Sequence, residues 1–241
     1  MVKLLRSIPA TRATQAAMAG IVFVLVATTT YLAALYPSLP DLLPVRFANG
    51  LPSRWQFTTP IRVLSPVFVQ VAMTLTLGAI GALLLSRPAH RGQSADGLRD
   101  SPEQRAALVT AEAVMQITLV WVLFQGYAAW ALVRMWTSGR DGLGFPYYAL
   151  QALGIVATVG IAARAHRRVG RPEPRPFVPE HWRFGHLYKN AEDPALFVPT
   201  RDGRRWTLNF GRPVAAALLG ITLLVGVLGP TLILMLMLRG T

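Results

Sequence analysis

Five stretches of the chain contain no charged residue and are long enough, or nearly so, to cross a lipid bilayer. They are residues 16–35, 63–85, 113–133, 145–163 and 214–238. A helix needs about 20 predominantly apolar residues to span a hydrocarbon core of roughly 30 Å. The pattern therefore predicts an all-α integral membrane protein with five transmembrane helices, and it excludes a soluble enzyme.

The segments between these stretches set the expected organisation. We expect transmembrane helices at residues 16–36, 61–86, 106–134, 145–166 and 213–238. A cytoplasmic N-terminus (1–15), an external loop (37–60), a cytoplasmic loop (87–105) and a small cytoplasmic module (176–213) complete the chain. Ser101, Pro102 and Glu103 have the order of a helix start, so the third helix should begin near Pro102. Gly226, Gly229 and Pro230 predict a kink in the fifth.

The basic residues are distributed unevenly between the two sides of this arrangement. Of the 24 Lys and Arg residues, 18 lie on the side of the N-terminus and 6 on the opposite side. Because cytoplasmic loops accumulate positive charge, we expect the N-terminus inside and the C-terminus outside. The first apolar stretch resembles a signal peptide at its start. Its length and the poor cleavage site at residues 32–34 favour an uncleaved helix.

Two further features concern the partners of the chain. The formal net charge of +13 is explained by contacts of the basic residues with anionic lipid headgroups on the cytoplasmic side rather than by binding to nucleic acid. The absence of cysteine excludes disulfides and thiolate metal sites.

Small residues recur at every fourth position in two of the helices. They are Thr74, Gly78 and Ala82 in the second helix and Gly154, Thr158 and Ala162 in the fourth. This spacing lets helix backbones approach closely in lipid, so it predicts ordinary packing faces of a helix bundle.

The loop after the first helix and the loop before the fifth carry most of the local signals. The proline-rich residues 38–60 should lie against the membrane surface, with Trp55 and Phe57 in the interfacial zone. Residues 196–209 predict a β-hairpin whose Asp202–Gly203 dipeptide favours a type I′ turn. Leu187–Tyr188 is a candidate third strand.

The external loop resembles the DUF1648 motif, a helix–loop–helix unit of membrane proteins similar to the SdpI family. The residues that match the motif or stand at its marked positions are Pro44, Arg46, Phe47, Gly50, Pro52 and Trp55. Arg46 stands where that family usually has histidine, and Ser53 where it usually has aspartate. The resemblance extends over residues 16–86.

The cytoplasmic module resembles the DUF5808 domain, and nearly every marker position of that pattern is matched. The matching residues are Trp182, Gly185, Tyr188, Asn190, Asp193, Pro194, Phe197, Pro199, Gly203, Trp206, Asn209, Phe210 and Gly211. Together the two resemblances imply a bacterial inner-membrane protein whose relatives act in peptide-toxin immunity and signalling. They imply no catalytic residue, cofactor or metal.

Candidate chemistry outside these motifs is sparse. His181 and His186 precede Glu192 and Asp193, but the spacing is unspecific, so we expect structural histidines rather than a metal site. Glu112 lies near the cytoplasmic end of the third helix, where we expect it to reach water; a proton- or ion-linked role is the alternative. No motif of a nucleotide-binding loop, hydrolase or metalloprotease occurs, and we expect no enzyme.

The aromatic and arginine residues of the module suit docking at the membrane interface. A surface for a membrane or cytoplasmic protein partner is an alternative, and a role in nucleic-acid binding is disfavoured. For the whole chain the leading hypothesis is a non-enzymatic immunity or signalling protein. The alternatives are an accessory subunit of a larger membrane complex and a small transporter. The polar residues available to a transporter are Gln70, Gln116, Gln125 and Gln151.

Overall fold

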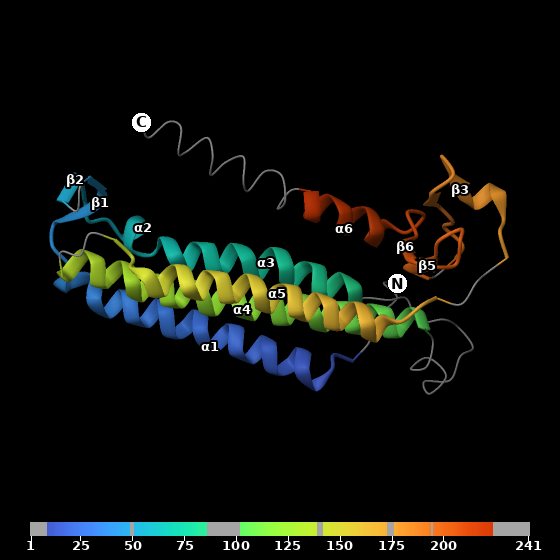
Figure 1. Ribbon diagram of the computed structural model, residues 1–241, viewed down its shortest axis with the longest axis horizontal. Helices are drawn as coiled ribbons and strands as arrows, with labels where there is room; N and C mark the ends of the chain where they lie inside the picture. Colours follow the sequence, from blue (N-terminus) through green and yellow to red (C-terminus); the bar gives the residue numbers. More distant parts are fainter. Residues whose placement is uncertain are drawn as a thin grey trace, which may run out of the picture. The chain divides into compact units, whose positions relative to one another are not determined.

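The computed structural model describes residues 9–48, 51–85, 102–138, 142–172, 176–193 and 195–223. Four of its helices are long and apolar enough to cross a membrane (Figure 1). They are α1 (Arg12–Leu35), α3 (Ser65–Leu85), α4 (Pro102–Ser138) and α5 (Phe145–Val169). Four of the five expected helices are therefore compatible with membrane spans by length and composition, and α4 begins at the predicted Pro102.

The fifth expected span is only partly described. Its first residues form α6 (Pro213–Leu223). Residues 224–238, with the kink expected at Gly226, Gly229 and Pro230, lie outside the described residues, as do residues 1–8, most of the loop at 87–105, and the motif residues Gly50 and Pro194.

The short elements of the described chain are one helix, two 3-10 helices and three hairpins. The helical pieces are α2 (Pro60–Val63), η1 (Tyr36–Ser38) and η2 (Pro179–His181). The antiparallel hairpins pair β1 (Leu42–Ala48) with β2 (Leu51–Phe57), β3 (Trp182–Arg183) with β4 (Leu187–Tyr188), and β5 (Phe197–Pro199) with β6 (Trp206–Leu208). Both strand segments expected in the module are thus confirmed.

The proline-rich loop expected after the first span contains the β1–β2 hairpin, which was not predicted from the sequence. The strands pair from Leu42 with Phe57 to Ala48 with Leu51, and bulges interrupt the register around Arg46. The sequence contained the signal for it, because Asn49–Gly50 is a dipeptide strongly favoured between hairpin strands. The prolines on either side obscured the strand pattern.

The chain divides into two compact units, and α3, α4 and α5 each contribute residues to both. The bundle unit consists of Arg12–Gly78 and Met115–Ala162. The module unit consists of the described residues within Met1–Thr11, Ala79–Val114 and Ala163–Thr241. It includes the hairpin module, the name used below for residues 176–213.

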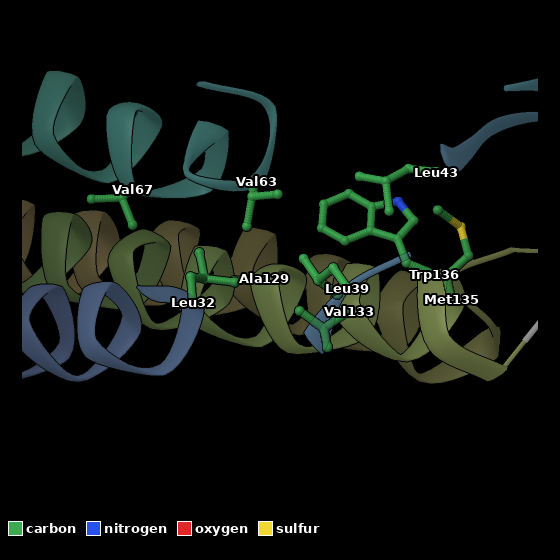
Figure 2. Close-up of a cluster of buried hydrophobic side chains, with 9 residues drawn as sticks. All are labelled: Leu32, Leu39, Leu43, Val63, Val67, Ala129, Val133, Met135 and Trp136. Carbon is green, nitrogen blue, oxygen red and sulfur yellow. The ribbon is translucent and has the colours of Figure 1, made fainter. Parts of the chain in front are cut away.

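The bundle unit has a hydrophobic core shared by its helices and the β1–β2 hairpin (Figure 2). Leu32 of α1, Val67 of α3 and Ala129 of α4 belong to one cluster. A second cluster joins Ile21 of α1 to Val122 of α4. Gln70 of α3 is also fully buried, and its Nε2 donates to Thr28 Oγ1 at 3.2 Å and to the Val122 carbonyl at 3.0 Å.

Small residues mark the close helix approaches of this unit, but only partly where the sequence predicted them. Gly154 is buried against Trp121, and Thr158 Oγ1 accepts a hydrogen bond from Trp121 Nε1 at 3.1 Å, as expected for a packing face. The corresponding expectation for Gly78 is wrong within the described chain, because no atom lies within 4 Å of the position of an added Cβ. A close approach that the spacing did not reveal is at Gly126, where an added Cβ would lie 3.2 Å from Thr28 Oγ1.

The core of the module unit joins the hairpin module to helices on either side of it in sequence. Leu84 of α3, Ala111 of α4 and Leu196 form a buried cluster with Ala215 and Leu218 of α6. Partly buried side chains of β5 and β6 pack on it. The hairpin module is therefore fixed to the ends of α3 and α6 and to the first turns of α4.

Candidate functional site

The β1–β2 hairpin is attached to the bundle by side chains at its base. Leu43 is fully buried, and Figure 2 shows it reaching toward the indole of Trp136 in α4. Val63 of α2 and Leu39 belong to the same cluster. Thr58 closes the open end of the hairpin by donating its backbone N–H to the Asp41 carbonyl at 2.8 Å. These contacts hold the hairpin in one orientation relative to the bundle unit.

The rest of the hairpin exposes large apolar side chains. Leu51 and Phe57 are 71% and 74% exposed, and Trp55 is half-exposed. Four DUF1648-like positions pair with one another across the two strands: Pro44 with Trp55, and Phe47 with Pro52. Arg46 lies opposite Arg54, so two positive charges share one face, as directly opposite residues do in antiparallel strands.

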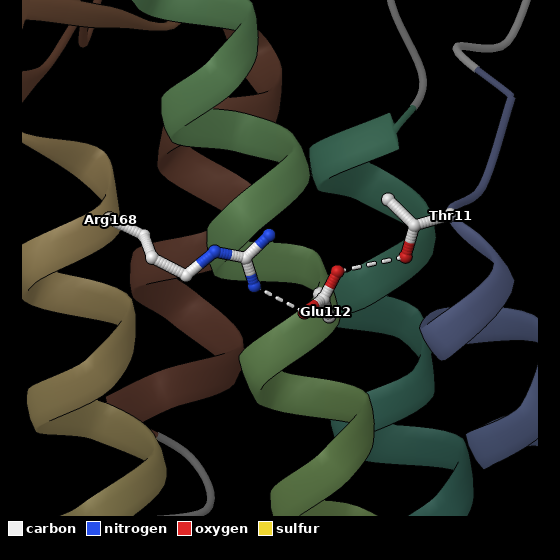
Figure 3. Close-up of polar contacts among 3 residues, drawn as sticks. All are labelled: Thr11, Glu112 and Arg168. Atoms are coloured by element: carbon white, nitrogen blue, oxygen red, sulfur yellow. Dashed lines mark hydrogen bonds and ion pairs between the residues drawn. The ribbon is translucent and has the colours of Figure 1, made fainter.

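Glu112 is the most buried acidic side chain among the described residues. Figure 3 shows it between Arg168 of α5, with which it forms an ion pair, and Thr11, which precedes α1. Thr11 Oγ1 donates to its second carboxylate oxygen at 2.9 Å. The expectation that Glu112 reaches water is wrong, because its side chain is only 9% exposed. No sequence pattern indicates Arg168 as its partner.

Asn209 is the centre of the hairpin module. It is fully buried, and its Nδ2 lies within hydrogen-bonding distance of the carbonyls of Asn190, Asp193 and Ala195. Its Oδ1 accepts from the backbone N–H of Asn190 and of Gly211. One side chain thus connects the segment after β4, the start of β5 and the start of α6.

Several other DUF5808-like residues support this arrangement. Tyr188 donates its hydroxyl to Asp193 at 3.0 Å, and its ring contacts the ring of Trp182 edge to face. Gly211 is required by space, because an added Cβ would lie 2.3 Å from the carbonyl carbon of Asn190. Trp206 donates its indole N–H at 3.2 Å to the carbonyl of Gly170, the residue after α5.

The loop between β5 and β6 differs from the expected turn. Among the described non-glycine residues only Phe184 has a positive φ, so Asp202 lacks the conformation that a type I′ turn needs. Instead Thr200 Oγ1 donates to Asp202 Oδ1 at 2.5 Å and accepts from the Arg205 N–H. The hydrogen bonds from the Thr200 hydroxyl and then from the Arg204 N–H lower the pKa of Asp202 below its ordinary value.

A cleft of about 480 Å³ lies between this loop and the β3–β4 turn. Strand β3 contributes Trp182 and the turn contributes His186, while the loop contributes Arg201 and Arg205 together with Thr200 and Asp202. The guanidinium of Arg201 lies 4.6 Å from the centre of the Phe177 ring, a cation–π contact that orients it. The sequence motifs did not indicate this cleft, since Arg201 and Arg205 are not motif positions.

The two module histidines have separate surroundings. His181 contacts the Tyr188 ring and lies 3.4 Å from Asn190 Nδ2, whereas His186 lines the cleft. Within the part of the chain that the structure describes, no group of three His, Asp or Glu side chains is placed to hold a metal ion.

The four glutamines considered for transport differ in burial. Gln70 is fully buried with its Oε1 unpartnered, whereas Gln151 is exposed and the other two are partly buried.

Comparison with known proteins finds no matching family model, no matching curated protein and no matching solved structure.

Proposed function

We propose that the chain is a non-enzymatic protein of a bacterial inner membrane, of the SdpI-like type, that acts in peptide-toxin immunity or envelope signalling. In this proposal the β1–β2 hairpin is the recognition surface. The observation that carries it is the contrast within the hairpin: Leu43 is buried in the bundle unit, while Leu51 and Phe57 are largely exposed. Exposed apolar patches beside polar groups are typical of interaction sites.

The proposed topology supports this role. The excess of basic residues on the N-terminal side favours a cytoplasmic N-terminus. One span precedes the hairpin and four precede the hairpin module. The hairpin then faces the exterior, and the module lies on the cytoplasmic side. The resemblance of residues 39–55 to the DUF1648 loop supports the same assignment.

The chemistry of the hairpin indicates the class of ligand. Trp55 and Phe57 offer aromatic surface, and Arg46 and Arg54 add positive charge on one face. Such a surface suits an amphipathic peptide that carries carboxylates, because apolar side chains supply contact area and arginine binds carboxylates with two parallel hydrogen bonds.

The test uses cells in which the gene is deleted and then complemented. We expect deletion to raise sensitivity to a panel of membrane-active peptides, and the wild-type chain to restore resistance. A Trp55→Ala/Phe57→Ala variant should fail to restore it at equal abundance in the membrane. The matched control is Leu153→Ala/Val156→Ala, which removes two similarly exposed apolar side chains from α5. Unchanged sensitivity after deletion, or full rescue by the hairpin variant, would overturn the proposal.

An accessory subunit of a larger complex is the second candidate. It is favoured by α5, because only 6% of the most apolar stretch of this helix is buried within the chain. A partner helix would cover this surface, although lipid covers it equally well in a lone protein. Purification in mild detergent decides the matter: a stoichiometric assembly with another protein supports the subunit, and a lone monomer or homo-oligomer contradicts it.

A further inference from the structure

The cleft of the hairpin module brings cationic and aromatic side chains together. Arg201 and Arg205 come from the loop between β5 and β6, and Trp182 and His186 come from the β3–β4 hairpin. The one acidic side chain in the lining is Asp202, and its Oδ1 already accepts hydrogen bonds from Thr200 and Arg204. A cleft with this lining attracts an anion, and the two guanidinium groups suit the oxygens of a phosphate.

The turn beside the cleft has an unusual conformation. Phe184 and Gly185 have φ values of +50° and +76°, and the His186 N–H donates to the Arg183 carbonyl at 3.3 Å. A positive φ is common at glycine but strained for a bulky residue. The Phe184 side chain is 87% exposed, so burial within the chain does not compensate for this strain. An apolar ring held outward at the tip of a turn indicates a contact outside the chain.

The position of the module in its own unit indicates what that contact is. Trp206 is hydrogen-bonded to Gly170, directly after the span α5. Leu196 belongs to one buried cluster with Leu84, next to the last residue of α3, and with Ala111 of α4. Leu84 and Ala111 lie within two residues of an end of an uncharged stretch, at 63–85 and 113–133. The ends of such stretches lie at the level of the lipid headgroups.

We propose that the cleft binds the phosphate of an anionic phospholipid headgroup, and that Phe184 enters the bilayer beside it. Arg201 and Arg205 contact the phosphate oxygens, and Trp182 lies along the headgroup. Arg183, next to Phe184 in sequence, adds charge at the same surface. The proposal is independent of peptide recognition by the β1–β2 hairpin, since it requires only that the spans lie in a membrane.

The first experiment measures lipid binding by the full chain in detergent. Phosphatidylglycerol is titrated in, and bound lipid is counted by native mass spectrometry. We expect Arg201→Gln/Arg205→Gln to lower the apparent affinity by about fivefold per arginine, as for basic residues at an anionic surface. The matched control is Lys189→Gln/Arg204→Gln, which removes the same charge from exposed residues outside the cleft lining. We expect this control variant to lose clearly less lipid affinity than the cleft variant.

Three outcomes would overturn the proposal. Equal losses in the two double variants would show diffuse attraction instead of a site. No loss in either would show that the cleft does not bind the lipid. Displacement of the lipid by inorganic phosphate at similar concentration would assign the site to a soluble anion. All four substituted residues are exposed, and a wild-type pattern in limited proteolysis checks that each variant remains folded.

The second experiment places residue 184 relative to the bilayer. The chain has no cysteine, so Phe184→Cys can be spin-labelled at a single position in the reconstituted full chain. In vesicles of phosphatidylcholine and phosphatidylglycerol we expect the label to be more accessible to oxygen than to a water-soluble nickel complex. The control is Ala191→Cys, an exposed position of the same module outside the cleft lining, which should show the opposite preference. Aqueous accessibility at both positions would exclude insertion.

Discussion

At the scale of single residues, the hairpin module depends on a buried amide and a glycine beside it. Asn209 contacts the backbone at Asn190, Asp193, Ala195 and Gly211. A buried polar group of this kind stabilises a fold only when its donors and acceptors are satisfied, which is the case here. No aliphatic side chain of the same size reproduces these contacts, and aspartate would replace the donors with acceptors.

Gly211→Ala tests how closely the chain approaches itself at this point. The added Cβ would lie 2.5 Å from the Asn190 carbonyl oxygen and 2.6 Å from the Ala191 nitrogen, so backbone must move. We expect the module to lose at least about 2 kcal/mol of stability, as in other overpacked sites. Hydrogen exchange of residues 187–209 in the purified chain measures it. Gly220→Ala is the control, since nothing lies within 4 Å of its added Cβ; equal behaviour of the two variants would contradict the explanation.

The loop that carries Arg201 and Arg205 should lose stability at low pH, when Asp202 becomes protonated. The pKa of Asp202 is lowered by hydrogen bonds from the Thr200 hydroxyl and the Arg204 N–H. Its ionised form therefore stabilises the folded loop at pH above the ordinary aspartate pKa, and this contribution is lost as pH falls through the lowered value. We expect the hydrogen-exchange rate of the Arg204 amide, corrected for its intrinsic pH dependence, to rise as the pH falls through the lowered pKa of Asp202. In Asp202→Asn the rise should be absent, and a rise in that variant would assign the effect to another group.

The importance of individual residues was only partly predictable from the sequence. The resemblance to DUF5808 marked Asn209 and Gly211 but not the contacts that require them, because most of these involve residues 14 to 21 positions away. The partner of Glu112 could not be predicted either, since Arg168 is 56 positions away on another helix. Side-chain pairs between elements depend on packing that a periodic pattern does not encode.

At the scale of elements, α4 combines an apolar span with a polar start. Its 37 residues correspond to roughly 55 Å of helix, more than a hydrocarbon core requires. Glu112 stands at the boundary between the two parts, directly before the uncharged stretch 113–133. Its ion pair with Arg168 joins α4 to the last turn of α5, where the hairpin module begins its connection.

Substitution of the two partners of this ion pair should not cost the same amount of stability. Arg168→Gln leaves a carboxylate that is almost fully buried, whereas Glu112→Gln leaves a guanidinium that is 43% exposed and can turn to water. We expect Arg168→Gln to cost about 2 kcal/mol, less than the loss of a partner in a fully buried pair. Glu112→Gln should cost less than Arg168→Gln, and the double variant should resemble Glu112→Gln. Thermal unfolding in detergent measures all three.

Arg167→Gln is the control for this comparison, because Arg167 is an exposed neighbour on the same helix that is hydrogen-bonded to the Ala163 carbonyl. If Arg168→Gln destabilised the chain no more than Arg167→Gln, the burial of Glu112 would not govern the energetics of the pair.

Elements were predictable where one signal dominates. The uncharged stretches gave four helices, and the Leu187–Tyr188 and 196–209 segments gave strands. The β1–β2 hairpin was missed because Pro44 and Pro52 argue against strands, yet proline is tolerated in an isolated two-stranded hairpin, where each strand has an edge. The small-residue face at Gly78 failed for a related reason: spacing alone does not say which helix face meets a neighbour.

At the scale of the whole molecule, the charge distribution and the number of spans together predict a sidedness. The β1–β2 hairpin follows the first span, and the hairpin module follows the fourth. Three spans separate them, so they must lie on opposite sides of the membrane if each helix crosses once. The positive-inside rule predicts that the module lies inside, because 11 of the 24 Lys and Arg residues lie between positions 164 and 212.

This sidedness can be tested at two positions in an otherwise cysteine-free chain. Ser53 of β2 and Glu192 of the module are both exposed, so Ser53→Cys and Glu192→Cys should tolerate a maleimide label. We expect an impermeant maleimide to label position 53 in intact cells or spheroplasts, and position 192 only after the membrane is opened. Labelling of both positions from outside would show that they lie on the same side of the membrane, so one of the three helices between them would not cross. The peptide-recognising hairpin and the lipid-binding module would then not be separated by the membrane. Labelling of position 192 alone from outside would keep the three crossings but reverse the orientation. The arginines of the module would then face the outer leaflet instead of the predicted cytoplasmic one.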